Sequence, residues 1–153
     1  PERVLGLHFF NPAPYMALVE VVQGIQSDPK KVELIMDWVH HHLGKEPVRV
    51  MDSPGFLVNR IARPFHLEAY RLVGNNLASK EQVDRIMCDA GFKMGPFELQ
   101  DLIGIDINYA ASTSVFNDFF HEPRFRPHPQ QRMILDSGFL GRKAKKGHYE
   151  HVE

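Results

Sequence analysis

A four-residue turn, Asp52-Ser53-Pro54-Gly55, divides the chain into two parts with different patterns. Before the turn, short apolar runs rich in β-branched residues predict strands, whereas after it apolar residues recur at helical spacing. A chain of 153 residues has room for one domain, or for a small domain and a piece of another. We therefore predict a change of architecture near residue 52, from an α/β part to an all-helical part, and a fold that is mainly α.

The part before the turn has the order strand, strand, helix, strand. The predicted strands lie at 4–10, 16–22 and 47–51. A segment with two prolines at 11–14 joins the first two strands as a turn. Asp28 as N-cap, Pro29 at the first helical position and Gly44 just past the end predict the limits of the helix.

The part after the turn is predicted to contain five helices. They are expected at about 56–73, 79–91, 96–103, 105–120 and 129–137. Ser79 and Gln82 form the pattern of a capping box at the start of the second of these helices. The tail from Gly141 to Glu153 is basic at first and then irregular.

The predicted sheet looks incomplete on physical grounds. Three short strands and one helix leave exposed edges, and a strand as apolar as VLGLHFF calls for cover on both faces. Pro1-Glu2-Arg3-Val4 also lacks an initiator methionine and a signal-peptide pattern. We expect that further elements precede Pro1 in the natural protein. Without them, the strands at 4–10 and 16–22 should be displaced, disordered or paired with another chain.

Two residues in the first two strands could carry chemistry together. Glu20 lies inside an apolar run, where an unpaired carboxylate is costly to bury. If the strands fold back at Pro14, His8 faces Glu20, because each lies six residues from the pivot. The glutamate would then fix the tautomer of the imidazole, as the acid of a catalytic triad does. A structural histidine and a water-facing glutamate remain the alternative.

Two further features admit both a functional and an ordinary interpretation. Asn59 lies in the first turns of the helix after Gly55, where its amide could donate to a substrate oxygen or simply cap the helix locally. The segment 141–147 carries four positive charges, which could meet phosphates or form a solvated tail. A role in nucleic-acid binding is disfavoured, since the rest of the chain is not basic and the net charge is −1.

Other site classes are disfavoured by residue type and spacing. The run His40-His41-His42 places its side chains about 100° apart around a helix and has no Cys or Asp cluster beside it, so we predict no metal site. The single cysteine, Cys88, suits a reducing compartment, and no apolar run is long enough for a membrane span. We expect a cytoplasmic location, with an organelle matrix left open. The sequence holds no G-x-G-x-x-G and no P-loop pattern.

Four segments, in order and spacing, resemble one family. They are LHFFNPAPYMALVEVV (7–22), DSPGFLVNRI (52–61), GFKMGPFELQDLIGID (91–106) and GRKAKKGHY (141–149). Together they resemble the 3-hydroxyacyl-CoA dehydrogenases, including the 3-hydroxybutyryl-CoA and 3-hydroxyadipyl-CoA enzymes. The resemblance implies that 1–51 is the end of a truncated Rossmann domain that binds NAD. It implies that 52–153 is an all-helical C-terminal domain that forms a homodimer.

The resemblance also implies an activity, the oxidation of 3-hydroxyacyl-CoA to 3-oxoacyl-CoA with NAD in fatty-acid β-oxidation or related acyl-CoA degradation. By this resemblance, His8 is the catalytic histidine, Glu20 is its partner, and Asn59 is the residue that reaches the substrate oxygen. The resemblance also implies that Asn11 and Lys143 contact NAD. The family's glycine-rich NAD fingerprint and its serine upstream of the histidine are missing from these residues.

We therefore expect the chain alone to be inactive and to bind NAD weakly. Two other interpretations stay open. One is a helical dimerisation module whose active-site residues are idle, and the other is a hydroxyacid or sugar-acid dehydrogenase with a similar helical domain, which the HFFNP and LVEV segments disfavour.

Overall fold

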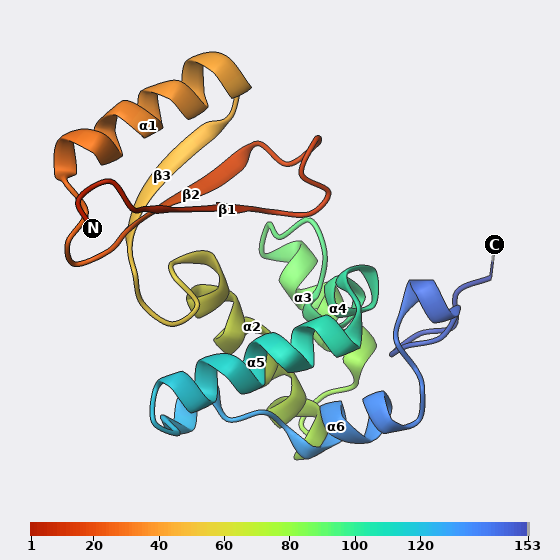
Figure 1. Cartoon of the computed structure of the whole chain (residues 1–153). Coiled ribbons are helices and arrows are strands. Elements are labelled where there is room, and N and C mark those ends of the chain that lie inside the picture. The colour runs from red at the N-terminus through yellow and green to blue at the C-terminus, as the bar shows by residue number, and fades with distance from the viewer. Residues whose placement is uncertain (153) are drawn as a thin grey trace. The chain divides into compact units, whose positions relative to one another are not determined.

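A computed structural model describes residues 1–152, which separate into two compact units. The N-terminal unit is residues 1–58, and the helical unit begins at Asn59. The elements (Figure 1) are β1 (Gly6–Phe9), β2 (Leu18–Gln23), α1 (Pro29–Leu43), β3 (Glu46–Met51), α2 (Val58–Gly74), α3 (Lys80–Asp89), α4 (Pro96–Ile103), α5 (Ile105–Asp118), η1 (Pro123–Phe125), α6 (Pro129–Asp136) and η2 (Arg142–Ala144). The order predicted from the sequence is thus present, with two short 3₁₀ turns added.

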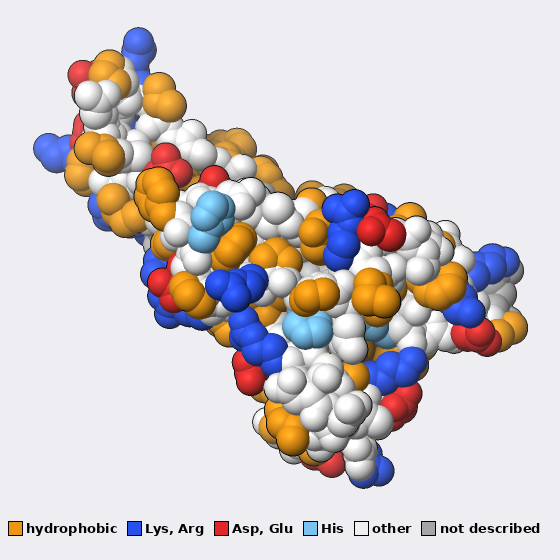
Figure 2. Space-filling model, turned by 90° about the horizontal axis from the view of Figure 1, so that it is seen from below, with side chains coloured by type: hydrophobic (Ala, Val, Ile, Leu, Met, Phe, Trp, Pro, Cys, Tyr) orange, Lys and Arg blue, Asp and Glu red, His pale blue; other side chains and the backbone are white. Residues whose placement is uncertain are grey.

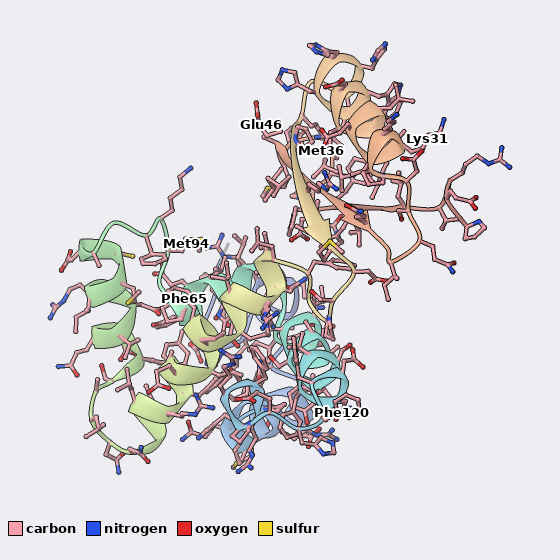
Figure 3. The ribbon with its side chains drawn as sticks, turned by 90° about the vertical axis from the view of Figure 1, so that its left-hand side faces the viewer. Lys31, Met36, Glu46, Phe65, Met94 and Phe120 are labelled. Carbon is pink, nitrogen blue, oxygen red and sulfur yellow. The ribbon has the colours of Figure 1, made fainter. Side chains whose placement is uncertain are left out.

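The sheet of the N-terminal unit has the order β1-β2-β3. β1 runs antiparallel to β2, and β2 runs parallel to β3. α1 connects β2 to β3 and covers the sheet with Val32 and Val39, which pack with Val19 and Val21 of β2. Met36 of α1 also packs against this cluster, whereas Lys31 projects from the same helix (Figure 3). This unit therefore has an apolar core of its own.

That core corrects two expectations. The fold class "mainly α" is wrong, because residues 1–58 form a three-stranded sheet covered by a helix rather than a few leftover strands. The strand predicted at 16–22 was also expected to lack a neighbour on one side. Instead β2 is the central strand and pairs on both sides, and five of its six residues are buried. The third strand, which follows α1 by only two residues, supplies the missing partner.

The predicted helix ends are confirmed where side chains determine them. The Asp28 carboxylate accepts a hydrogen bond from the Lys30 N–H at 2.9 Å, and Gly44 ends α1 in the left-handed conformation. Ser79 and Gln82 form the reciprocal capping box of α3. Hydrogen bonds between residues close in sequence therefore mark these limits.

The helical unit has an apolar cluster and a buried polar one. Ala69, Tyr70, Val83 and Phe97 form the apolar cluster. Asp101 of α4, which is fully buried, accepts hydrogen bonds from the backbone N–H groups of His148 and Tyr149 and from the ring of His151. The tail that looked irregular in the sequence is thus tied to α4 through one carboxylate.

Two histidines, His66 and His148, are buried in the helical unit. His66 is 1% exposed and its Nδ1 has no hydrogen-bond partner within the described residues. Burial, reinforced by the positive charge of Arg63, lowers the pKa of His66 to about 3. Burial likewise lowers the pKa of His148 to about 4. Below about pH 6.5 these imidazole rings become protonated in the unfolded chain, whereas in the folded chain they stay neutral until the pH is much lower.

We therefore predict that the free energy of unfolding falls as the pH is lowered from about 6.5 towards 4, with His66 contributing a slope of up to about 1.4 kcal/mol per pH unit. Urea unfolding at several pH values measures this slope. His66→Gln should flatten it by that amount, and the exposed His40→Gln should leave it unchanged. An equal slope in all three proteins would contradict the prediction.

Candidate active site

The strand register places His8 directly opposite Glu20. His8 Nδ1–H donates to Glu20 Oε2 at 2.7 Å, so the contact predicted from the two strands is confirmed. The side chain of Glu20 is 0% exposed and that of His8 is 34% exposed. A buried carboxylate thus holds an imidazole that solvent can still reach.

The second carboxylate oxygen of Glu20 is also occupied. Oε1 accepts hydrogen bonds from the backbone N–H groups of Leu57 and Val58, each at 2.9 Å. These N–H groups stand where α2 starts, and the first N–H groups of a helix lack partners within the helix. Three donors therefore meet the carboxylate and offset the cost of burying it.

The turn at 52–55 orients the N–H groups of Leu57 and Val58 towards Glu20. Gly55 and Phe56 both have positive φ, at 72° and 45°, and the Phe56 N–H donates to the Ser53 carbonyl. Positive φ is common for glycine but strained for phenylalanine. The Phe56 ring lies 5.6 Å from that of His8, and the Phe10 ring lies 4.8 Å from it. The turn was predictable from its residue types, but the roles of Leu57 and Val58 were not, because backbone groups leave no residue-type signal.

This geometry defines what the pair can do. The Glu20 contact fixes the tautomer with the proton on Nδ1, so Nε2 carries the lone pair. No residue of the N-terminal unit bonds to Nε2. A nitrogen in this state can accept a proton from a hydroxyl, and the adjacent carboxylate stabilises the imidazolium that results.

The other three predicted site residues make contacts within their own units. Asn11 is exposed in the turn after β1, which Lys45 braces by donating to the carbonyls of Ala13 and Met16. Asn59 lies in the first turn of α2, where its carboxamide oxygen accepts from Arg63 Nη2 at 3.4 Å. Lys143 Nζ lies 2.6 Å from both carboxylate oxygens of Asp106. Its hydrogen bond holds the pKa of Asp106 below the usual range.

The tail offers a positively charged hollow. It is lined by Arg142, Lys143, Lys145, His151 and Val152. Ammonium and guanidinium groups of this kind suit hydrogen bonds to phosphate groups. Lys143 is therefore one of several cationic groups around this hollow.

Two other site classes find no counterpart in residues 1–152. No three His, Cys, Asp or Glu side chains are grouped there in a way that could hold a metal ion. In that part of the chain no helix is both long and apolar enough to cross a membrane. The run His40-His41-His42 instead packs with itself and Trp38, by ring contacts along α1.

Comparison with known proteins gives matches along both units. Residues 1–53 match the family described as 3-hydroxyacyl-CoA dehydrogenase, NAD binding domain, and residues 55–151 match 3-hydroxyacyl-CoA dehydrogenase, C-terminal domain. The first match also argues against the mainly-α class, since it assigns the sheet to an α/β domain.

Individual relatives agree with this. The chain is 49% identical to 3-hydroxyadipyl-CoA dehydrogenase of Escherichia coli over 98% of its length, which is 32% of that protein. It is 41% identical to the mitochondrial hydroxyacyl-coenzyme A dehydrogenase of Sus scrofa, over 98% of the chain and 48% of the relative. It therefore spans about a third to about a half of the length of these relatives.

Solved structures match closely as well. The crystal structure of 3-hydroxybutyryl-CoA dehydrogenase from E. coli aligns with a TM-score of 0.93 at 49% identity, over 98% of this chain and 32% of that one. The (S)-3-hydroxybutyryl-CoA dehydrogenase of Ralstonia eutropha aligns with a TM-score of 0.90 at 38% identity, over 97% and 52%. The chain belongs to the 3-hydroxyacyl-CoA dehydrogenase family.

Proposed function

We propose that the protein carrying this chain interconverts 3-hydroxyacyl-CoA and 3-oxoacyl-CoA with NAD. The observation that supports this most directly is the 2.7 Å contact between a partly exposed His8 and a buried Glu20. Such a pair is suited to move the hydroxyl proton of an alcohol.

In the proposed mechanism His8 Nε2 accepts the proton of the 3-hydroxyl group while the carbon gives up hydride. NAD, when bound, supplies the hydride acceptor. Glu20 stabilises the imidazolium, and the amide of Asn59 donates to the substrate oxygen as its charge changes. In the reverse direction His8 returns the proton to the oxygen of the 3-oxo group. Asn11 and Lys143 are the residues of this chain proposed to hold NAD.

The finer assignments rest on the relatives. Those named above act on 3-hydroxyadipyl-CoA, hydroxyacyl-CoA or 3-hydroxybutyryl-CoA, so we propose a CoA thioester as substrate and a place in fatty-acid β-oxidation or related acyl-CoA degradation. We also propose a boundary between the two domains near residue 52 and a cytoplasmic or organelle-matrix location.

The activity can be tested with acetoacetyl-CoA and NADH, by following NADH absorbance in the native protein with any residues that flank this chain. His8→Gln should lower kcat by about 10²- to 10⁴-fold, as expected for loss of a general acid–base. His40→Gln is the matched control and should keep full turnover. The 153-residue chain alone should be inactive, because it has no glycine-rich phosphate turn. Near-full turnover by His8→Gln would refute the assignment.

Glu20→Gln should act on both chemistry and structure. The neutral amide stabilises an imidazolium less than a carboxylate does, and its NH₂ group cannot accept hydrogen bonds. We expect a fall in kcat with little change in KM, together with faster hydrogen exchange at the Leu57 and Val58 amides. Glu33→Gln, which removes an exposed partner of Arg49, should change neither. An unchanged kcat in Glu20→Gln would refute the role proposed for the carboxylate.

We further propose a homodimer formed through the helices of the 56–120 region. Ile61 is 66% exposed and Leu57 is also exposed, whereas Phe65 stacks on Phe92 and Leu72 packs on the helical core. Figure 2 shows apolar side chains exposed at several places on one face of the molecule. Exposed apolar side chains on a helix are typical of a face that is covered in an assembly.

Sedimentation at tens of micromolar tests the dimer. Ile61→Lys should shift the protein to monomer, because it places a charge in an apolar interface. Leu77→Lys, which changes a side chain that is 70% exposed and follows α2, should leave the dimer intact. A monomeric wild-type protein would contradict the proposal.

A further inference from the structure

Arg63 is a buried cation without an acidic partner. Arg63 is 3% exposed, and none of the ion pairs among residues 1–152 involves it. Burial lowers the pKa of Arg63 to about 10, so it stays charged at neutral pH. A buried charge is costly unless it is compensated, and in most proteins a carboxylate supplies that compensation.

Neutral oxygens compensate Arg63 instead, and they come from two helices. Nη1 donates to the Asn108 carbonyl at 3.0 Å and to Ser112 Oγ at 3.2 Å, both on α5. Ser112 Oγ in turn donates to the Asn108 carbonyl at 2.9 Å. This end of the guanidinium is thereby fixed by a buried polar pair on α5.

The rest of the guanidinium is directed at Asn59. Nε donates to the Asn59 backbone carbonyl at 3.2 Å, and Nη2 donates to its side-chain Oδ1 at 3.4 Å. Because guanidinium can only donate, it selects the amide orientation with oxygen towards Arg63. Nδ2 is left as the free end of the amide, and nothing among residues 59–152 accepts its hydrogens.

We propose that Arg63 is a positioning residue that holds the Asn59 carboxamide with its NH₂ group presented to the substrate oxygen. This inference rests on the proposed function of Asn59. The planar, always-charged guanidinium spans α5 and Asn59 with several donors in fixed geometry, and a lysine ammonium cannot do so. The positive charge also favours the carboxamide dipole that donates to an oxygen gaining negative charge.

A double-mutant cycle in the native protein, with any flanking residues, tests the coupling. In the protein that keeps Asn59, Arg63→Lys should lower kcat by about tenfold or more, with KM nearly unchanged. In the Asn59→Ala background the same change should have almost no effect, because the group through which it acts is gone. Arg132→Lys, an exposed arginine paired with Asp136, should leave kcat unchanged in both. An equal fall in both backgrounds, or no fall, would overturn the proposal.

A second measurement does not depend on activity. In the 153-residue chain labelled with ¹⁵N, Arg63→Lys should shift or broaden the side-chain amide signals of Asn59, and Arg132→Lys should not. Unchanged Asn59 signals would refute the positioning role even if the enzyme proved active. If instead the wild-type protein showed no turnover, the proposed function would fail while this measurement still decided the role of Arg63.

A milder variant covers the case in which Arg63→Lys does not fold. Ser112→Ala removes one of the two α5 acceptors of Arg63 and keeps the charge in place. It should lower kcat several-fold when Asn59 is present and leave it unaltered in the Asn59→Ala background. The opposite pattern, a fall only without Asn59, would overturn the proposal.

Discussion

The buried carboxylate of Glu20 is the constraint on which the candidate active site depends. A charge with no exposed surface in the central strand must find donors, and it finds three, one on His8 and two on the backbone at the start of α2. The first fixes the tautomer of the imidazole. The other two require the chain to turn sharply after β3, which it does through left-handed Gly55 and strained Phe56. The position of the His8 imidazole and the path of the backbone thus follow from one desolvated charge.

Features set by local chemistry could be predicted from the sequence. Asp28, Gly44 and the Ser79–Gln82 pair fixed helix ends, because caps depend on residues only a few positions apart. The His8–Glu20 contact was also predictable, since a glutamate in an apolar strand needs a partner and the proline turn sets the register. These inferences needed only short sequence separations or one strongly constrained pairing.

The remainder depended on tertiary packing. The mainly-α class failed because the sequence pattern gave no measure of how completely α1 would cover β2 or of how β3 would complete its pairing. Arg63 gave no signal either, because an arginine on a helix is usually exposed, and its partners Asn108 and Ser112 lie more than 40 residues away. Backbone donors such as those of Leu57 and Val58 are invisible to any argument from residue type.

Two buried charges of opposite sign, on Glu20 and Arg63, are both compensated by hydrogen bonds to neighbouring groups. Glu20 is satisfied by donors and fixes an imidazole, while Arg63 is satisfied by neutral acceptors and fixes a carboxamide. In each case the charge makes more than one additional contact to rigid backbone or helix, so the functional side chain is held by a group that cannot easily move. Residues 57–59 contribute to both arrangements in immediate succession, two through their N–H groups and one through its side chain. An insertion or deletion within this short segment would therefore disturb the support of His8 and the placement of the Asn59 amide together, whereas a substitution at Leu57 or Val58 that keeps the backbone would disturb neither.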